Sequence, residues 1–412
     1  MVPLHSLRFH FTIPRYIFGK TMGRLFPSLL WNSGLSCLKY QQMPDPVLPS
    51  DHWVKIKVTY GGICGSDLHL IHLHDSPSTS PFASFPFTIG HETVGRISEV
   101  GLAVKNLQVG DRVTVDPVLS CMVRGLPNPC EACRRGDYSL CSHMTDGDIA
   151  PGLMIGACRD TGGSWSTYLV AHQSQVLKLP DEINDLNGVL IEPFSCALHG
   201  VMRNPPRDDD TVLVVGAGTI GICVVAALRA LDIACKIVVV SKYDVQTKLA
   251  LHYGADEVIG LKGKDYKSIY EIAEALKARV LKPVIGPPVI QGGAHIVYEC
   301  VGNSRSVHDA LRFAQSGGKV VLLGLAGILD HIDWTTVWLN ELDVRGSFAY
   351  STEEFNGKRM RTMQIAIELM KLGKVDLSPL ITHRFPLEKY KDALSTVVNK
   401  GKEACLKAVF EP

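Results

Sequence analysis

The chain has 412 residues, of which 46% are hydrophobic and 20% charged, and its formal net charge is +1. This length suits two domains rather than one core. The near-zero net charge argues against the strongly positive surface with which proteins bind nucleic acid. No run of eighteen apolar residues occurs, so we expect no membrane span and small-molecule partners instead. Twelve cysteines in a long chain without a secretory leader are expected to be reduced thiols of a cytoplasmic protein, some of them holding metal.

Residues 1–44 contain no Asp or Glu, whereas Arg8, Arg15, Lys20 and Arg24 are basic. Organelle transit peptides share this composition, but prolines interrupt any long amphipathic helix here. We expect an N-terminal extension packed on the fold, with an organelle-targeting segment as the alternative.

From Trp53 to Val115, apolar and polar residues alternate between glycine turns, which predicts the short strands of a partly open β-barrel. Two glycine-rich corners of this region carry Cys64 and His91, which are natural zinc ligands that need a third. Glu192 lies in an apolar stretch, where a carboxylate is costly unless a cation such as a metal pairs it.

A cluster of cysteines follows the predicted barrel strands. Cys130, Cys133 and Cys141 have the spacing C-x2-C-x7-C, and Cys121 precedes them. Thiolates this close together in one loop can converge tetrahedrally on a single zinc ion.

After Asp210 short apolar strands alternate with helical patterns, which predicts a parallel, doubly wound sheet. Strands are expected over 211–218, 236–241, 257–260, 294–302 and 319–327, and helices over 222–232, 245–256 and 306–317. After Gly346, a helix over 360–375 and a final segment over 381–398 are expected to return to the first domain.

Gly216, Gly218 and Gly221 form a G-x-G-x-x-G fingerprint between an apolar strand and an apolar helix, with Thr219 and Ile220 inside it. The three glycines allow a tight turn, backbone approach to a pyrophosphate and close packing of helix on strand. The phosphates are expected at the helix N-terminus, where free N–H groups favour anions.

The next predicted strand ends in Ser241 and Lys242, where an acid that grips the ribose of NAD would stand. A hydroxyl followed by a cation suits a 2′-phosphate, which favours NADP. The alternative is that Lys242 is merely solvated, with Asp244 or a backbone group serving the ribose of NAD.

The motifs GICGSD, GHE, the cysteine cluster, IEP and GAGTIG occur in this order in the zinc-dependent medium-chain alcohol and polyol dehydrogenases. Over residues 40–412 the chain resembles their sorbitol, threonine and butanediol dehydrogenase branch. The resemblance implies an α/β fold with a GroES-like β-barrel domain, a Rossmann-like domain, an active site in the cleft between them, and homodimers or homotetramers. We accordingly expect an extension (1–44), a catalytic domain (45–204), a coenzyme domain (205–346) and a returning segment (347–412).

The resemblance also assigns roles to residues of the first domain. Cys64 and His91 match catalytic zinc ligands, and Glu192 matches the third ligand. Glu92 matches a residue that neighbours the zinc or alternates as its ligand. Which of the two carboxylates binds the zinc stays open.

Ser66 and His69 match the family's relay, in which a hydroxyl and an imidazole pass the alcohol proton to solvent. The implied reaction is reversible hydride transfer between NAD(P) and a secondary alcohol, diol or polyol. The alternatives are a non-catalytic nucleotide-binding or redox-sensing protein, and a biosynthetic NADPH-dependent carbonyl reductase.

In the family the cysteine lobe reads C-x2-C-x2-C-x7-C and holds a second, structural zinc. Here eight residues separate Cys121 from Cys130, so we expect Cys121 to remain the first ligand after a six-residue insertion. The alternative is that Cys130, Cys133 and Cys141 bind zinc together with His143 or another donor.

Overall fold

The computed structural model describes residues 4–261 and 267–412, and the chain divides into two compact units. Unit 1 comprises Met1–Glu192 and Tyr350–Pro412, and unit 2 comprises Pro193–Ala349. The C-terminal segment therefore belongs to the same unit as the N-terminal half. The boundary between the two units lies within helix α5 (Asp185–Arg203).

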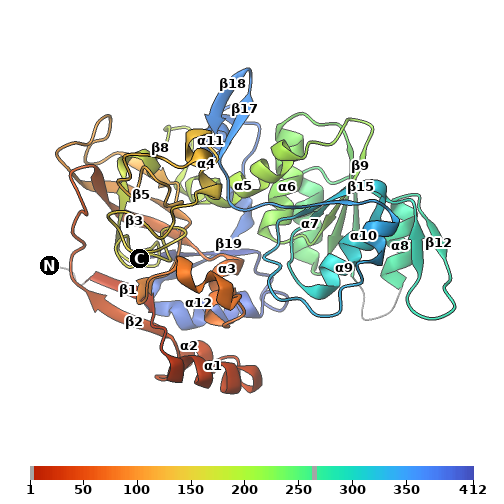
Figure 1. Cartoon of the computed structure of the whole chain (residues 1–412), viewed down its shortest axis with the longest axis horizontal. Helices are drawn as coiled ribbons and strands as arrows, with labels where there is room; N and C mark the ends of the chain where they lie inside the picture. Colours follow the sequence, from red (N-terminus) through yellow and green to blue (C-terminus); the bar gives the residue numbers. More distant parts are fainter. Residues whose placement is uncertain (1–3, 262–266) are drawn as a thin grey trace. The chain divides into compact units, whose positions relative to one another are not determined.

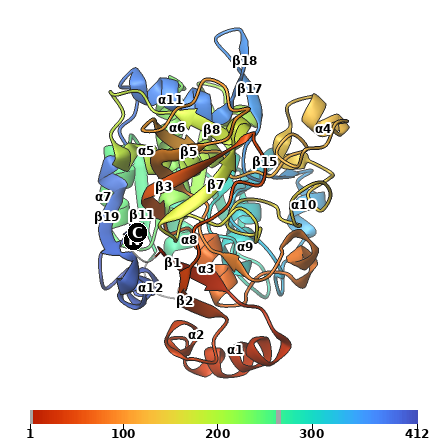
Figure 2. The same cartoon turned by 90° about the vertical axis from the view of Figure 1, so that its left-hand side faces the viewer.

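Unit 1 consists mainly of β-structure. Its strands are β1 (Leu4–Phe9), β2 (Leu38–Met43), β3 (Trp53–Gly62), β4 (Phe87–Thr88), β5 (Thr93–Val100), β6 (Arg112–Val115), β7 (Tyr168–His172), β8 (Val176–Lys178), β17 (Thr352–Phe355), β18 (Lys358–Arg361), β19 (Ile381–Pro386) and β20 (Lys407–Glu411). Strands β19, β20, β3, β5, β6 and β8 follow one another in a seven-stranded sheet, and β7 pairs with β3. Strands β2, β1 and β4 form a second sheet, and β17 and β18 form a hairpin that projects beside α11 (Figure 2).

Helices and short turns connect these strands. The helices are α1 (Ile13–Leu25), α2 (Leu29–Asn32), α3 (Gly65–Ile71), α4 (Glu131–Arg134), α11 (Thr362–Lys371) and α12 (Tyr390–Val398), with 3₁₀ turns over Pro77–Phe82, Tyr138–Leu140, Gln173–Gln175, Ser378–Leu380 and Leu387–Lys389. Apolar clusters fill the unit, including one around Ile56 and Leu169 and another around Trp165 and Phe410.

The N-terminal extension is part of unit 1. Strands β1 and β2 pair antiparallel, and the last residues that pair are Phe9 and Leu38. Residues 10–37 therefore form the connection between the two strands of a hairpin. It holds α1 and α2, which lie beyond β1 and β2 at the edge of the unit (Figure 1). Pro14 stands in the first turn of α1, where its missing N–H costs no hydrogen bond, so this proline begins a helix instead of interrupting one.

Unit 2 contains a six-stranded parallel sheet of order β11-β10-β9-β14-β15-β16. Its strands are β9 (Thr211–Val215), β10 (Lys236–Ser241), β11 (Glu257–Gly260), β14 (Ala294–Glu299), β15 (Ala314–Leu322) and β16 (Asp343–Gly346), beside a small hairpin of β12 (Arg279–Leu281) and β13 (Val289–Gln291). In order along this sheet the strands run 3-2-1-4-5-6, which is the Rossmann arrangement of a doubly wound fold. The predicted parallel sheet is thus present.

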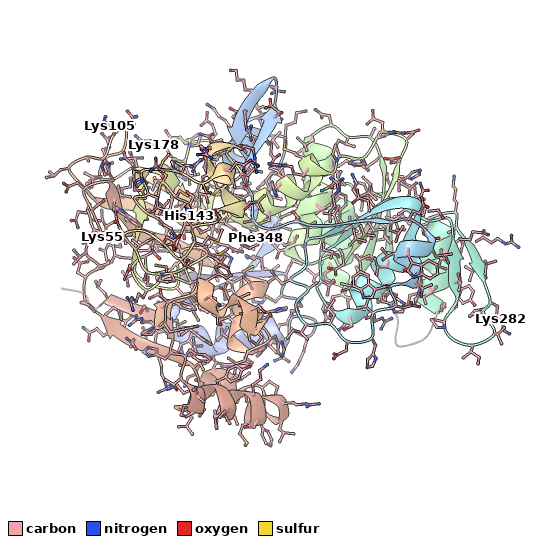
Figure 3. All side chains as sticks on the ribbon, viewed as in Figure 1. Lys55, Lys105, His143, Lys178, Lys282 and Phe348 are labelled. Carbon is pink, nitrogen blue, oxygen red and sulfur yellow. The ribbon has the colours of Figure 1, made fainter. Side chains whose placement is uncertain are left out.

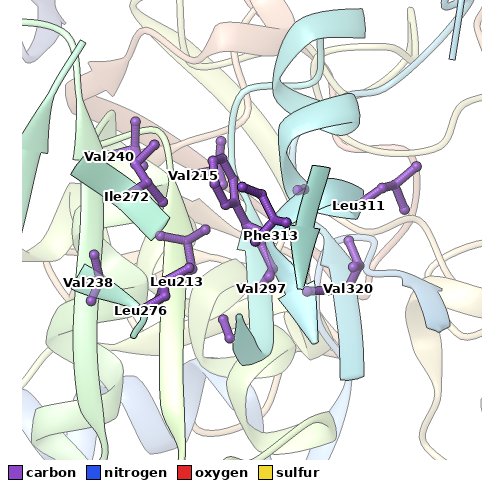
Figure 4. Packing of buried hydrophobic residues seen from close by; sticks show 14 of the residues in the cluster. Leu213, Val215, Val238, Val240, Ile272, Leu276, Val297, Leu311, Phe313 and Val320 are labelled. Carbon is purple, nitrogen blue, oxygen red and sulfur yellow. The ribbon is translucent and has the colours of Figure 1, made fainter. Parts of the chain in front are cut away.

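Helices α6 (Thr219–Ala230), α7 (Asp244–His252), α8 (Lys267–Ala275), α9 (Ser304–Phe313) and α10 (Thr335–Leu339) accompany this sheet. Leu213 and Val297 from the strands pack with Leu311 and Phe313 of α9 (Figure 4). The expected helix over 306–317 is wrong in its last turn, because β15 already begins at Ala314, where the chain pairs with β14. Within the described ranges, no helix combines the length and the apolar character that crossing a membrane requires.

Candidate functional site

The candidate reacting centre lies at the start of helix α3 in unit 1. Cys64 is the N-cap of α3, and its backbone N–H donates to the Asp67 carboxylate at 2.8 Å. The other Asp67 oxygen lies 3.5 Å from Nδ1 of His91, which leaves Nε2 as the nitrogen for a metal. Burial lowers the pKa of His91, but Asp67 and Cys64 outweigh this and hold it well above its usual value. Asp67 therefore orients both candidate ligands.

Glu92 is fully buried next to His91 and forms an ion pair. Nζ of Lys407, on β20, lies 2.5 Å from each Glu92 carboxylate oxygen and donates to the Ile63 carbonyl at 3.0 Å. Burial lowers the pKa of Lys407, but Glu92 and other acids outweigh this and raise it. A Cβ atom at Gly62 would lie 1.7 Å from Glu92 Oε2, so only glycine leaves room for this carboxylate.

Three different donor types converge at this centre. The ligand atoms of Cys64, His91 and Glu92 all lie within 4.8 Å of one another, and Glu192 is outside this group. Glu192 is nevertheless buried, interacts electrostatically with His91 and Glu92, and accepts a 3.2 Å hydrogen bond from the Tyr350 hydroxyl. Burial raises the pKa of Glu192 to about 7, although His91 acts to lower it. Thiolate, imidazole and carboxylate are ligands that zinc takes, so this donor set fits a zinc ion.

Ser66 and His69 lie three residues apart on α3, a spacing that puts them on one side of the helix. The Ser66 Oγ atom is buried and has no hydrogen-bond partner among the residues that the structure describes, which leaves it for a bound molecule. Burial lowers the pKa of His69. Its ring centroid lies 6.1 Å from that of His74, an exposed residue. Helix α3 therefore carries a buried hydroxyl at Ser66 and, at His69, an imidazole that lies next to an exposed histidine.

The four clustered cysteines also converge in unit 1. The sulfur atoms of Cys121, Cys130, Cys133 and Cys141 all lie within 4.8 Å of one another. Backbone N–H groups of Cys130, Cys133 and His143 approach three of these sulfurs at 3.3 to 3.5 Å. A hydrogen bond from Cys133 lowers the pKa of Cys141 to about 5. Four sulfurs with N–H donors fit a closed, tetrahedral zinc site.

His143 stands beside this group and not in place of a cysteine. Its Nδ1 lies 3.5 Å from the Cys121 sulfur, and the residue is labelled in Figure 3. Cys121 reaches the other three sulfurs across the eight intervening residues, so the insertion leaves four cysteines together.

One buried cation anchors the insertion. Arg124 is fully buried, and its guanidinium donates to the carbonyls of Leu119 (3.1 Å), Asp146 (2.9 Å), Ile149 (3.2 Å), Ala150 (3.4 Å) and Gly152 (2.8 Å). Burial lowers the pKa of Arg124, while nearby thiols and Asp146 raise it. The inserted residues thereby tie the chain before Cys121 to the chain after Cys141.

The fingerprint of unit 2 has the geometry of a phosphate-binding turn. Gly216 has φ of +99°, and a Cβ at Gly221 would lie 1.9 Å from the Gly216 carbonyl. Nothing lies within 4 Å of a Cβ placed at Gly218, which is the N-cap of α6 and precedes Thr219 and Ile220. The first and third positions require glycine, and the second is open for close approach of a ligand to the backbone.

The end of strand β10 presents one accessible cation. Ser241 is 2% exposed, and its hydroxyl lies 2.7 Å from that of Thr247. Lys242 is exposed, with its ammonium 5.4 Å from the centroid of the Tyr243 ring. Asp244 begins α7. Of the two residues predicted to meet a 2′-phosphate, Lys242 is free to do so, whereas the Ser241 hydroxyl is already paired.

Comparisons with known proteins identify the family to which the chain belongs. Residues 50–181 match the family described as alcohol dehydrogenase GroES-like domain, and residues 219–364 match the family described as zinc-binding dehydrogenase. The chain is 32% identical to L-idonate 5-dehydrogenase of Vitis vinifera over 90% of its length and 91% of the relative. The chain belongs to the zinc-binding alcohol dehydrogenase family. The predicted family, α/β fold and pair of domain types are thereby confirmed.

Other relatives of this dehydrogenase extend the comparison. It is 31% identical to sorbitol dehydrogenase of Arabidopsis thaliana, over 89% of its own length and 90% of that protein. Among solved structures, a zinc-binding dehydrogenase of Sinorhizobium meliloti 1021 bound to NADP is similar with a TM-score of 0.70 and 25% identity, and the match covers 100% of both chains.

Three residues that shape the sites of the dehydrogenase were not singled out from its sequence. Lys407 carries a usable signal, because a lysine inside the apolar pattern CLKAVFEP indicates a buried ion pair. Arg124 and Tyr350 carry none, because their partners come from segments far away in sequence or from main-chain carbonyls.

Replacing the buried arginine is expected to loosen the cysteine lobe. In Arg124→Met the five carbonyls lose their donor, and we expect release of one zinc per chain to a chelator to become about tenfold to a hundredfold faster. The measurement is zinc release followed with a colorimetric chelator. Arg134→Met removes an equal charge from an exposed position of the same lobe and serves as the control. Equal release rates in the two variants would contradict the anchoring role.

Breaking the buried ion pair is expected to destabilise unit 1 strongly. Lys407→Met leaves the Glu92 carboxylate buried without its cation, and we expect a loss of about 3–5 kcal/mol in the free energy of unfolding. Urea unfolding measures it, and Lys407→Met combined with Glu92→Gln should recover part of the loss. In the exposed Lys371–Glu182 pair, 4.0 Å apart, Lys371→Met should cost less than about 1 kcal/mol. Similar losses in the free energy of unfolding for Lys407→Met and Lys371→Met would argue against a stabilising role of the buried ion pair.

Proposed function

We propose that this dehydrogenase transfers hydride between NAD(P) and a secondary alcohol, diol or polyol, in either direction. The observation that carries the proposal is the convergence of Cys64, His91 and the buried Glu92 carboxylate. Two residues after Cys64, the Ser66 hydroxyl has no hydrogen-bond partner among the described residues. Relatives named for sorbitol and L-idonate support the polyol class.

We assign the catalytic zinc to Cys64, His91 and Glu192. Both oxygens of Glu92 lie against Lys407, which favours Glu192 as the third ligand and Glu92 as a neighbouring anion. A bound zinc supplies a Lewis acid that lowers the pKa of an alcohol. The structural zinc is assigned to the four-cysteine group of the lobe.

Ser66 and His69 are assigned to proton transfer. The Ser66 hydroxyl has no partner among the described residues and can accept a hydrogen bond from an alcohol and pass its proton on. Burial lowers the pKa of His69, which keeps the imidazole neutral and able to take that proton. In carbonyl reduction the same two groups return the proton, so a biosynthetic reductase would use the same residues.

The coenzyme is assigned to the fingerprint of unit 2, and NADP is favoured over NAD. Gly218, Thr219 and Ile220 present the N-terminus of α6 to a pyrophosphate. The exposed ammonium of Lys242 would meet a 2′-phosphate, and Ser241 would need to give up its bond to Thr247 to join it.

The remaining organisation is proposed in the same way. Residues 45–204 and 347–412 supply the catalytic domain, and residues 205–346 supply the coenzyme domain. We propose a homodimer or homotetramer in the cytoplasm. The exposed apolar residues Ile13 and Leu25 of α1 offer one surface for assembly.

Removing the candidate ligand Cys64 is expected to abolish turnover and to lower the zinc content by one ion per chain. Wild-type protein should contain two zinc ions per chain and Cys64→Ser one, with no change in nicotinamide absorbance on any polyol or ketone. Cys235→Ala, which alters a buried thiol of unit 2, should keep both metals and the activity. A wild-type protein without zinc and without turnover would favour a redox-sensing protein, and an active Cys64→Ser would end the assignment of this ligand.

Coenzyme preference is expected to follow the charge at residue 242. In Lys242→Asp the repulsion of the 2′-phosphate should raise the KM for NADP by about tenfold or more, while the KM for NAD changes little. Initial rates with both coenzymes measure this. Lys248→Asp, on α7, is the control for a general change in charge. An unchanged ratio of the two KM values would favour the ribose contact through Asp244.

A further inference from the structure

The cysteine lobe contacts the segment that returns to unit 1. Ser139 lies between the zinc-site residues Cys133 and Cys141, and its hydroxyl lies 2.9 Å from that of Ser351. The Ser139 N–H also donates to the Ser351 hydroxyl at 3.3 Å. Both serines are buried, although 212 positions separate them. A buried contact with two hydrogen bonds fixes the two segments relative to each other.

Ser351 is held from its other side as well. Thr362 donates to the Ser351 carbonyl from its N–H at 3.1 Å and from its hydroxyl at 3.2 Å. The neighbouring Thr352 hydroxyl donates to the Gly136 carbonyl of the lobe at 3.3 Å. The backbone at residue 351 therefore has little freedom, and its position depends on the lobe.

Ser351 directly follows Tyr350, whose hydroxyl donates to Glu192 at 3.2 Å. The Tyr350 side chain is 1% exposed, so its ring cannot move without displacing packed neighbours. We infer that Tyr350 is a positioning residue for the Glu192 carboxylate, and that the cysteine lobe sets its place through Ser139 and Ser351. This inference rests on the proposed function, because Glu192 is the carboxylate assigned to the catalytic zinc.

The physical reason is that a closed metal site orders the chain between its ligands. A zinc ion bound by the four cysteines would make the seven residues between Cys133 and Cys141 a short, fixed loop, and Ser139 is part of it. Loss of that order removes the support of Ser351 and lets the Tyr350 hydroxyl leave Glu192. If the lobe had a structural role only, disrupting it would lower the stability of the chain without changing the ligand geometry at the reacting centre.

The test uses the full chain with zinc in the lobe and Co²⁺ as a spectroscopic probe at the reacting centre. Ser139→Ala is expected to shift the visible ligand-field bands of that Co²⁺ and to lower kcat/KM by about threefold to tenfold. Cys133→Ser should reproduce the spectral shift. Thr145→Ala removes an exposed hydroxyl from the same lobe and should leave spectrum and kinetics unchanged. If Ser139→Ala does not fold, Ser351→Ala tests the contact from the opposite side, because it removes both hydrogen bonds between the two residues.

A double variant separates this route from a general loss of stability. In a Tyr350→Phe background the link to Glu192 is already cut, so adding Ser139→Ala should shift the bands no further. An unchanged spectrum in Ser139→Ala, or a full additional shift in the Tyr350→Phe background, would overturn the inference. A wild-type chain that binds no Co²⁺ at Cys64 and His91 would instead overturn the proposed function, so the two failures are distinguishable.

Discussion

The architecture of unit 1 depends on neutralising charges that have been taken out of water. A carboxylate as deeply buried as Glu92 is tolerated only with a cation against it, and Lys407 supplies one from a strand 315 positions away. The same ammonium binds the carbonyl next to Cys64. One ion pair therefore joins the C-terminal strand to the corner that carries the candidate ligands.

The two candidate metal centres arrange their donors in opposite ways. The cysteine lobe directs backbone N–H groups onto sulfur and leaves its sulfurs facing one another, which suits a site that does no chemistry. The reacting centre mixes a thiolate, an imidazole and carboxylates, and keeps a buried hydroxyl at Ser66 without a partner among the described residues. Unsatisfied groups of this kind are expected where a substrate is to bind.

Much of this organisation could be predicted from the sequence, because it depends on local patterns. The parallel sheet of unit 2 follows from short apolar strands between helices, and the fingerprint glycines lie where the turn requires them. The grouping of the cysteines likewise follows from their spacing. The partners of Lys407 and Tyr350 could not be predicted, because they come from segments far away in sequence, and those of Arg124 could not, because they are main-chain carbonyls that no motif marks. The hydrogen bond of the Ser241 hydroxyl could not be predicted either, since its partner Thr247 lies on the following helix and is not marked by any motif.

The arginine inside the cysteine lobe has a consequence for how such lobes are recognised. The spacing between the first two cysteines is not a physical requirement of the metal, because Arg124 organises the extra residues around main-chain carbonyls and keeps the sulfurs together. A search that demands two residues between those cysteines would pass over this chain. In this chain the lobe is marked by its last three cysteines together with an arginine in the preceding loop.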